Sequence, residues 1–317
     1  MLQTLLKIGE WQSEGKSEWD RFLAAPKINT EDRKGNKITN YVLPILFDLD
    51  EKQVLVDKPQ LHEYREEHVK NLKALKIQGG NNKAIYSTVP ADKLIQLFKT
   101  FFGKFEDANP EIELIEAIKK ADEELLTDSF NDLLLEIFTL REQAVKTFQY
   151  WNKNKKEFEI NKKGLEDATE IQANENLALV YITIKSSKHK ILKPTPFAEL
   201  EAYEKFLRAK FGLDKSENSK SLKVATSKKI CYVSGELTTN VDELDLSTRY
   251  SINKMFVTET KNYASLFSGK NFKLNYQVSE TNQEKLDYAS NYLLNNLKAK
   301  IANIEHVIIP QFQDSEI

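Results

Sequence analysis

The sequence predicts an α+β fold that is predominantly helical and carries small β-sheets and a degenerate zinc-ribbon-like module. Three observations predict it: long stretches with apolar residues at helical spacing, β-branched and aromatic runs typical of strands, and two C-x-x-C-like positions that have lost most of their cysteines. We expect a mixed hairpin and helical region at 1–176 and a basic α+β region at 177–317, with the ribbon-like module at 231–282. A helical insertion into a single α+β domain would give the same pattern.

The N-terminal region is expected to begin with a short helix and a β-hairpin. Residues 2–11 carry apolar side chains at helical spacing. Residues 37–56 contain two apolar runs around the turn Asp48-Leu-Asp-Glu-Lys, a pattern that predicts a hairpin. The elements expected next are a charged helix at 61–75, a polar turn at 79–83, a short strand at 84–88, and helices at 92–102, 111–121 and 125–150.

The C-terminal region is expected to open on a buried strand. Residues 177–184 form a continuous apolar run bounded by polar clusters, which is the pattern of a strand covered on both faces. An amphipathic helix is expected within 194–212, another helix at 283–301, and a closing strand at 307–310.

Charge is segregated along the chain. The 317 residues have a formal net charge of only −2, which excludes a uniformly basic nucleic-acid binder. Residues 104–136 hold 11 acidic and 3 basic side chains, whereas residues 183–229 hold 12 basic and 5 acidic ones. Such segments are either solvated faces or a phosphate-facing surface beside an acidic, partner-facing one.

The composition predicts a soluble cytoplasmic protein that makes no contact with a membrane. A single cysteine cannot form an intramolecular disulfide, which favours a reducing compartment. No apolar run approaches the ~18 residues that a spanning helix needs. The N-terminus lacks the charged-then-apolar order of a secretion signal.

The sequence does not indicate catalysis. The Walker lysine loop, the nucleophile elbow and the dinucleotide fingerprint are all absent. His62 and His68 are separated by a spacing that does not place two ligands on one helix face. We therefore expect a non-enzymatic protein with no catalytic residues, no cofactor and no bound metal.

The ribbon-like module has kept one of the four ligand positions of a zinc site. Cys231-Tyr-Val-Ser234 stands where the first C-x-x-C would lie, and Ser279-Glu-Thr-Asn282 stands where the second would lie. One cysteine cannot hold zinc, so apolar packing must replace the metal, with Cys231 itself as a small buried apolar residue. The expected substitutes are Phe256, Phe267, Phe272, Leu274 and Val278.

The order of segments around this module resembles a known family. The chain offers Cys231-Tyr-Val-Ser-Gly-Glu, then Phe256-Val-Thr-Glu-Thr-Lys-Asn-Tyr-Ala264, Asn271-Phe, Tyr292-Leu and Ile309-Pro-Gln-Phe312. This ordered set resembles the large subunit of the type I-B CRISPR Cascade surveillance complex. The opening segment with Gly15 and Trp19, and the segment Leu75–Tyr86, are also similar. Large subunits of that family are usually longer, so the chain resembles an N-terminal portion, a split subunit or a compact variant.

The resemblance implies a non-catalytic, nucleic-acid-binding subunit of a ribonucleoprotein complex. Such a subunit binds at the 5′-handle end of the crRNA, recognises the motif beside the protospacer (the PAM) and helps to open the DNA duplex. Its implied partners are crRNA, target DNA, a 5′-handle-capping subunit, a backbone subunit, a small subunit and, later, a helicase-nuclease. The loops that offer cations, amides and an aromatic ring supply the expected contacts: Asn81, Asn82, Lys83, Lys185, Lys188, His189, Lys190, Lys254, Thr258, Lys261, Asn262, Tyr263, Lys270 and Asn271.

Two other functions remain open from the residues alone. A helical scaffold or adaptor could bind protein partners through its acidic segment at 106–136. A metal-dependent nuclease would require carboxylates to converge in space.

Overall fold

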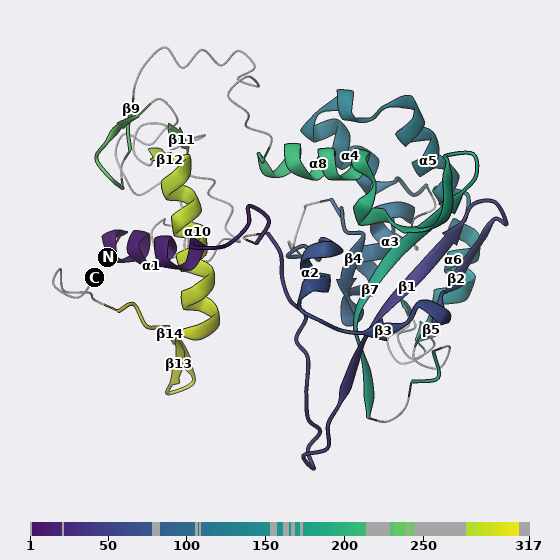
Figure 1. The fold of residues 1–317 in the computed structure, drawn as a ribbon, viewed down its shortest axis with the longest axis horizontal. Coiled ribbons are helices and arrows are strands. Elements are labelled where there is room, and N and C mark those ends of the chain that lie inside the picture. Colours follow the sequence, from purple (N-terminus) through teal and green to yellow (C-terminus); the bar gives the residue numbers. More distant parts are fainter. Residues whose placement is uncertain are drawn as a thin grey trace. The chain divides into compact units, whose positions relative to one another are not determined.

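The chain folds into two compact units in the computed structural model (Figure 1). The structure describes residues 2–20, 22–77, 83–104, 107, 109–152, 157–160, 165, 169–171, 174–213, 229–231, 233–238, 241–243 and 277–310. We call residues 22–216 the sheet unit, and residues 1–21 together with 217–317 the terminal unit. The α+β prediction is confirmed, because helices and small sheets both occur.

The sheet unit contains most of the α-helices that the structure describes. They are α2 (Glu67–Asn71), α3 (Leu94–Phe102), α4 (Glu113–Ala121), α5 (Asp128–Phe138), α6 (Arg141–Phe148) and α8 (Glu201–Phe211). The side chain of Thr127 caps α5 by accepting a hydrogen bond from the backbone N–H of Phe130. The left-handed residue Gly212 ends α8.

A mixed sheet in the order β2-β1-β7-β4 forms the centre of this unit, with β3 paired to β1 and β8 paired to β7. The strands are β1 (Thr39–Asp48), β2 (Gln53–Val56), β3 (His62–Glu63), β4 (Thr88–Pro90), β7 (Glu175–Ser186) and β8 (Ile191–Pro196). Strands β1 and β7 run parallel from Thr39↔Glu175 to Asp48↔Lys185, with one register shift between Tyr41 and Val42. A parallel pair needs a long crossover, and the helices between the two strands supply it.

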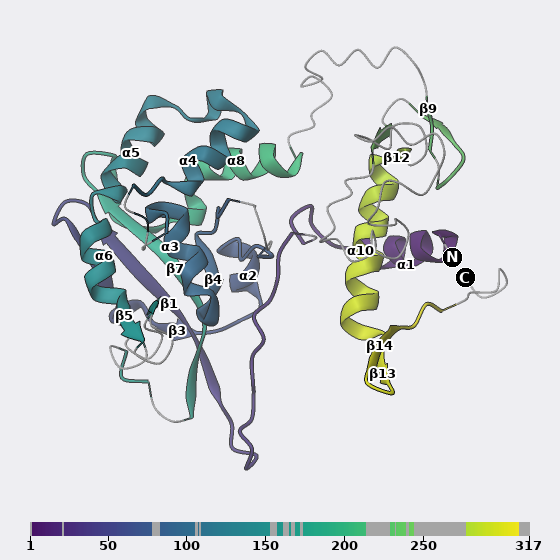
Figure 2. The same ribbon diagram turned by 180° about the vertical axis from the view of Figure 1, so that it is seen from behind.

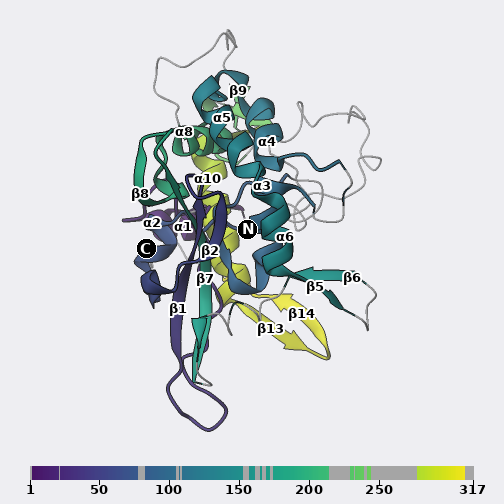
Figure 3. The same cartoon turned by 90° about the vertical axis from the view of Figure 1, so that its right-hand side faces the viewer.

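Helices cover both faces of the sheet, as Figures 2 and 3 show. On one face, Phe47 of β1 packs against Phe101 and Phe102 of α3. On the other, Val42 and Leu179 pack in a core cluster with Leu72, Ala74 and Tyr181 that includes α2. Burial on both faces explains why β1 and β7 lack polar alternation.

The terminal unit joins the two ends of the chain. Helix α1 (Leu2–Ser13) crosses α10 (Glu280–Asn296), and the two helices share one apolar core. The two helices approach closely at Gly9, because a Cβ added there would lie 1.9 Å from the carbonyl oxygen of Lys285. Trp11 also meets the ring of Tyr292 edge-on, with 5.4 Å between centroids.

Short two-stranded sheets complete the described chain. The terminal unit holds β9 (Lys229–Ile230) with β10 (Leu237–Thr238), β11 (Val241–Glu243) with β12 (Gln277–Ser279), and β13 (Lys298–Ile301) with β14 (Ile304–Val307). The sheet unit holds β5 (Gln149–Asn152) with β6 (Glu157–Ile160). Figure 3 shows the β13–β14 hairpin next to the end of α10.

Several elements differ from their predicted form. The predicted helix at 61–75 is helical only at Glu67–Asn71, because β3 pairs with β1 before it and Lys73 takes a positive φ of 50° after it. The predicted helix at 125–150 is interrupted at 139–140 and ends in β5. The predicted strand at 84–88 lies instead at Thr88–Pro90.

The division into units also differs from the predicted boundary near 176. That position lies inside β7, whose pairing with β1 ties both sides of the boundary into one unit. The first 21 residues belong with the C-terminal segment, because α1 packs on α10.

Candidate functional site

The turn between β7 and β8 gathers a predicted group of cationic residues. Lys185 lies near the end of β7, and Lys188, His189 and Lys190 lie in the turn that follows. The carboxylate of Asp50, in the β1–β2 turn, holds this turn in place. It accepts hydrogen bonds from the Ser187 backbone N–H at 2.8 Å and from the Ser187 hydroxyl at 3.0 Å. These bonds, led by the backbone N–H, lower the pKa of Asp50.

Carboxylates neutralise most of the charge in this turn. Lys185 Nζ lies 3.0 Å from Asp48, and Lys188 Nζ lies 2.6 Å from Asp132 and 3.2 Å from Glu136. The hydrogen bond to Asp132 is the main cause of the raised pKa of Lys188, and the same bond lowers the pKa of Asp132. A phosphate that binds here must compete with these acids, so the turn is a weaker phosphate site than its lysine count suggests.

Lys190 and Lys83 differ from these residues in their surroundings. Lys190 is exposed at the tip of the turn, in the left-handed conformation with φ 61°. Lys83 is exposed directly before the buried residue Ala84. The other predicted contacts lie outside the described residues: Asn81, Asn82, Lys254, Thr258, Lys261, Asn262, Tyr263, Lys270 and Asn271.

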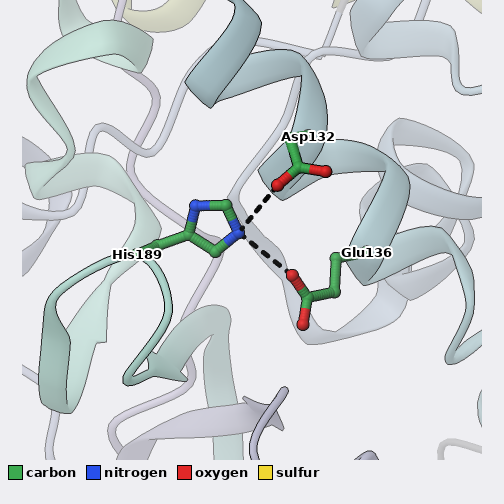
Figure 4. Close-up of side chains that lie close together, drawn as sticks. All are labelled: Asp132, Glu136 and His189. Atoms are coloured by element: carbon green, nitrogen blue, oxygen red, sulfur yellow. Dashed lines mark hydrogen bonds and ion pairs between the residues drawn. The ribbon is translucent and has the colours of Figure 1, made fainter.

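A cluster of two carboxylates and one imidazole lies beside the turn (Figure 4). Asp132 and Glu136 project from α5 toward the Nε2 atom of His189, which lies 3.7 Å from the former and 3.0 Å from the latter. One donor atom of each residue lies within 4.8 Å of the others. Sequence reasoning missed this cluster. The i, i+4 carboxylate pair was visible on a predicted helix, but only the packing of β7–β8 on α5 brings the histidine to it.

The four positions that were predicted as a degenerate ligand set lie close together in the terminal unit. The Sγ atom of Cys231 accepts hydrogen bonds from the Ser279 backbone N–H at 3.3 Å and from the Asn282 side-chain amide at 3.4 Å. Ser234 adds further hydrogen bonds to the same sulfur. Burial opposes ionisation of this thiol, but these hydrogen bonds outweigh it and lower the pKa of Cys231 to about 6.

The sulfur is embedded in the apolar core of the terminal unit. Cys231 is fully buried together with Val233 and Val278. These residues pack against Leu5 and Ile8 of α1 and against Leu286, Ala289 and Leu293 of α10. Cys231 thus lies in an apolar core, as expected, and Val278 contributes to it. The expected substitutes Phe256, Phe267, Phe272 and Leu274 lie outside the described residues.

The two histidines rejected as helical ligands are neighbours in space. The rings of His62 on β3 and His68 on α2 meet edge-on, with 4.7 Å between centroids. Burial, followed by the proximity of His62, lowers the pKa of His68. The backbone N–H of Arg65 donates to Nδ1 of His68 at 2.9 Å. This ring nitrogen is therefore used within the fold.

In a comparison with known protein families, the C-terminal part of the chain matches one family model. Residues 228–317 match the family model of the central domain of the CRISPR-associated protein TM1802. The match lies within the terminal unit and includes all four positions around the Cys231 sulfur. It supports a role in a CRISPR-Cas system. No curated protein and no solved structure matches the chain.

Among the helices that the structure describes, none is both long enough and apolar enough to cross a bilayer.

Proposed function

We propose that the chain is the non-catalytic large subunit of a CRISPR RNA-guided surveillance complex of the Cascade type. The match at 228–317 to a CRISPR-associated central domain is the observation that carries this proposal. It falls on the segment whose ordered residues resemble the large subunit of the type I-B complex. The subunit binds the 5′-handle end of the crRNA and the target duplex beside the protospacer, where it recognises the PAM and helps to separate the strands.

The location of the predicted contacts supports this role. Seven of them fall inside the matched segment: Lys254, Thr258, Lys261, Asn262, Tyr263, Lys270 and Asn271. They mix cations for phosphates with amides for base edges and one aromatic ring for stacking. In the sheet unit, Lys83 and Lys190 are the more accessible contacts, because Lys185, Lys188 and His189 already have carboxylate partners. We expect this nucleic-acid surface to be made mainly by the terminal unit.

The proposed partners follow from this role. They are crRNA, target DNA, the 5′-handle-capping, backbone and small subunits, and a helicase-nuclease that arrives later and cuts. Base pairing with the guide reads most of the target, and the protein reads a short duplex element, as in other RNA-guided effectors.

A scaffold that binds protein partners is the second candidate function. One observation favours it: Asp132 and Glu136 neutralise Lys188 in the sheet unit. The positive charge of this surface is therefore lower than its number of lysines suggests. A scaffold of this kind has no need of the lysines at 254–270, and DNA binding distinguishes the two candidates.

The test measures binding of a fluorescent duplex to the purified full chain at several salt concentrations. Lys261→Ala with Lys270→Ala should weaken binding to every sequence and reduce the salt slope by about 2, near 1 for each phosphate that the lysines no longer neutralise. The matched control is Lys58→Ala with Lys205→Ala, which removes two lysines paired with Glu170 and Glu201. Equal weakening in both double variants, or no measurable binding by the wild type, would contradict the proposal. Changes at Asn262, or at Asn81 with Asn82, should alter sequence preference instead.

A further inference from the structure

We propose that Asp132, Glu136 and His189 form a binding site for one divalent first-row transition-metal ion, with Lys188 as the protein's own cation that vacates the site when metal binds. The CRISPR-related match at 228–317 does not include these residues, and the proposed function assigns no metal to them.

The spacing of the donor atoms fits a shared ion. Nitrogen and oxygen ligands lie ~2.0–2.2 Å from such a metal, so two adjacent ligands around one ion lie ~3.0–3.5 Å apart. The Nε2 atom of His189 lies 3.0 Å from the Glu136 oxygen and 3.7 Å from the Asp132 oxygen. Small rotations of two side chains would bring all three donors onto one ion, and water would complete its coordination.

A cation already occupies this position. The ammonium of Lys188 lies 2.6 Å from the Asp132 oxygen and 3.2 Å from the Glu136 oxygen, the same two oxygens that face His189. This tethered cation shows that the pair of carboxylates attracts positive charge at this point. The Lys188 side chain is 58% exposed, so it can leave toward solvent without disrupting the core.

The supporting structure holds the ligands in place. Asp132 and Glu136 lie four residues apart on α5, which places them on one helix face. The imidazole of His189 is only 7% exposed, and Asp50 anchors the turn that carries it through Ser187. Asp132, by contrast, is about half exposed, so an ion and its water ligands can enter from that side.

The donor set selects the class of metal. One imidazole with two carboxylates suits Mn²⁺ or Zn²⁺ better than Ca²⁺, which favours a shell made of oxygen alone. With a neutral imidazole, the three ligands carry a formal charge of −2 and balance a divalent ion. Metal binding releases the ammonium of Lys188, which then becomes free to contact an anion at the turn.

The experiment uses the purified full chain, stripped with a chelator and titrated with Zn²⁺ by calorimetry and with Mn²⁺ by electron paramagnetic resonance. The wild type should bind one ion of at least one of these metals. Glu136→Gln should weaken that binding by at least tenfold, and Lys188→Met should tighten it about tenfold by removing the competing cation. Glu116→Gln is the matched control, because it removes one carboxylate from α4, where Glu116 pairs with Lys119. Circular dichroism verifies that each variant is folded.

Each outcome decides the proposal. Binding that is weakened at least tenfold in Glu136→Gln, strengthened in Lys188→Met and unchanged in Glu116→Gln supports the site. Absence of binding in both the wild type and Lys188→Met overturns it and leaves an internal ion-pair cluster. Binding that is equal in all variants also overturns it, because the metal then lies elsewhere.

Discussion

Replacing Cys231 with Ala should destabilise the terminal unit in a pH-dependent way. The change removes the acceptor of the Ser279 N–H and the Asn282 amide, which meet the sulfur in a buried site. An unsatisfied buried donor costs ~1–3 kcal/mol, so we expect a loss of about 2–4 kcal/mol near pH 8. The loss should be smaller at pH 6, because the thiol is then protonated in the unfolded state and only about half ionised in the folded state.

The sign of the pH dependence follows from the depressed pKa of Cys231. The thiol has a pKa of about 6 in the folded protein against 9.0 for an ordinary cysteine. The stabilisation is therefore fully present above pH 9 and is lost as the pH falls through about 6. A shift of three units corresponds to at most about 4 kcal/mol. Wild-type stability should rise relative to Cys231→Ala across this window.

Urea unfolding followed by tryptophan fluorescence provides the assay. Of the three tryptophans, only Trp151 lies in the sheet unit, so a Trp151→Phe background reports on the terminal unit through Trp11 and Trp19. The matched control is Cys231→Ser, which keeps an acceptor atom but does not ionise in this pH range. At pH 6 the Ser variant should lose less stability than the Ala variant. The difference in stability between these two variants should not grow as the pH rises above 6. A difference between wild type and Cys231→Ala that stays constant from pH 6 to 9 would refute the reasoning.

Three other perturbations test the structure. Gly9→Ala should lower the thermal midpoint, because overpacking against Lys285 costs ~1–3 kcal/mol and exceeds the ~0.5–1 kcal/mol that alanine normally adds to a helix; a raised midpoint would contradict the α1–α10 packing. The lowered pKa of His68 means that its protonation opposes folding, so stability should fall as the pH drops below about 6.5. His68→Gln should remove the part of this loss that is due to His68. The same pH dependence of stability in His68→Gln and in the wild type would contradict this role of His68. Cysteines at positions 234, 279 and 282, added to Cys231, should bind Co²⁺ with a tetrahedral thiolate spectrum; lack of that spectrum would mean that the four positions do not form a ligand set.

Local patterns predicted the elements whose surroundings are simple. The apolar run at 177–184 predicted β7 because helices cover both faces of the sheet at this strand. The hairpin of β1 and β2 followed from its turn residues, and its pairing is regular from Ile45↔Val56 to Asp48↔Gln53. In both places the residues that decide the structure are close together in the sequence.

Contacts between distant segments could not be predicted in the same way. Helix α1 is an ordinary amphipathic segment, and nothing local to it indicates that Gly9 packs on Lys285. The boundary predicted near 176 differs from the division into units for the same reason, because composition does not show that β7 pairs with β1. Cys231, Ser234, Ser279 and Asn282 were predicted as one set from their paired spacing in the sequence, and they do meet at the Cys231 sulfur. His189 belongs to no such pattern, so its approach to Glu136 emerged only from the fold.

Purification from the native host tests whether the chain belongs to an RNA-guided surveillance complex. The tagged chain would be recovered under mild conditions, and the RNA that accompanies it would be sequenced. We expect uniform short RNAs that share a 5′ handle and carry variable spacers. Recovery of protein partners in good yield without such RNA would contradict it and favour the scaffold function.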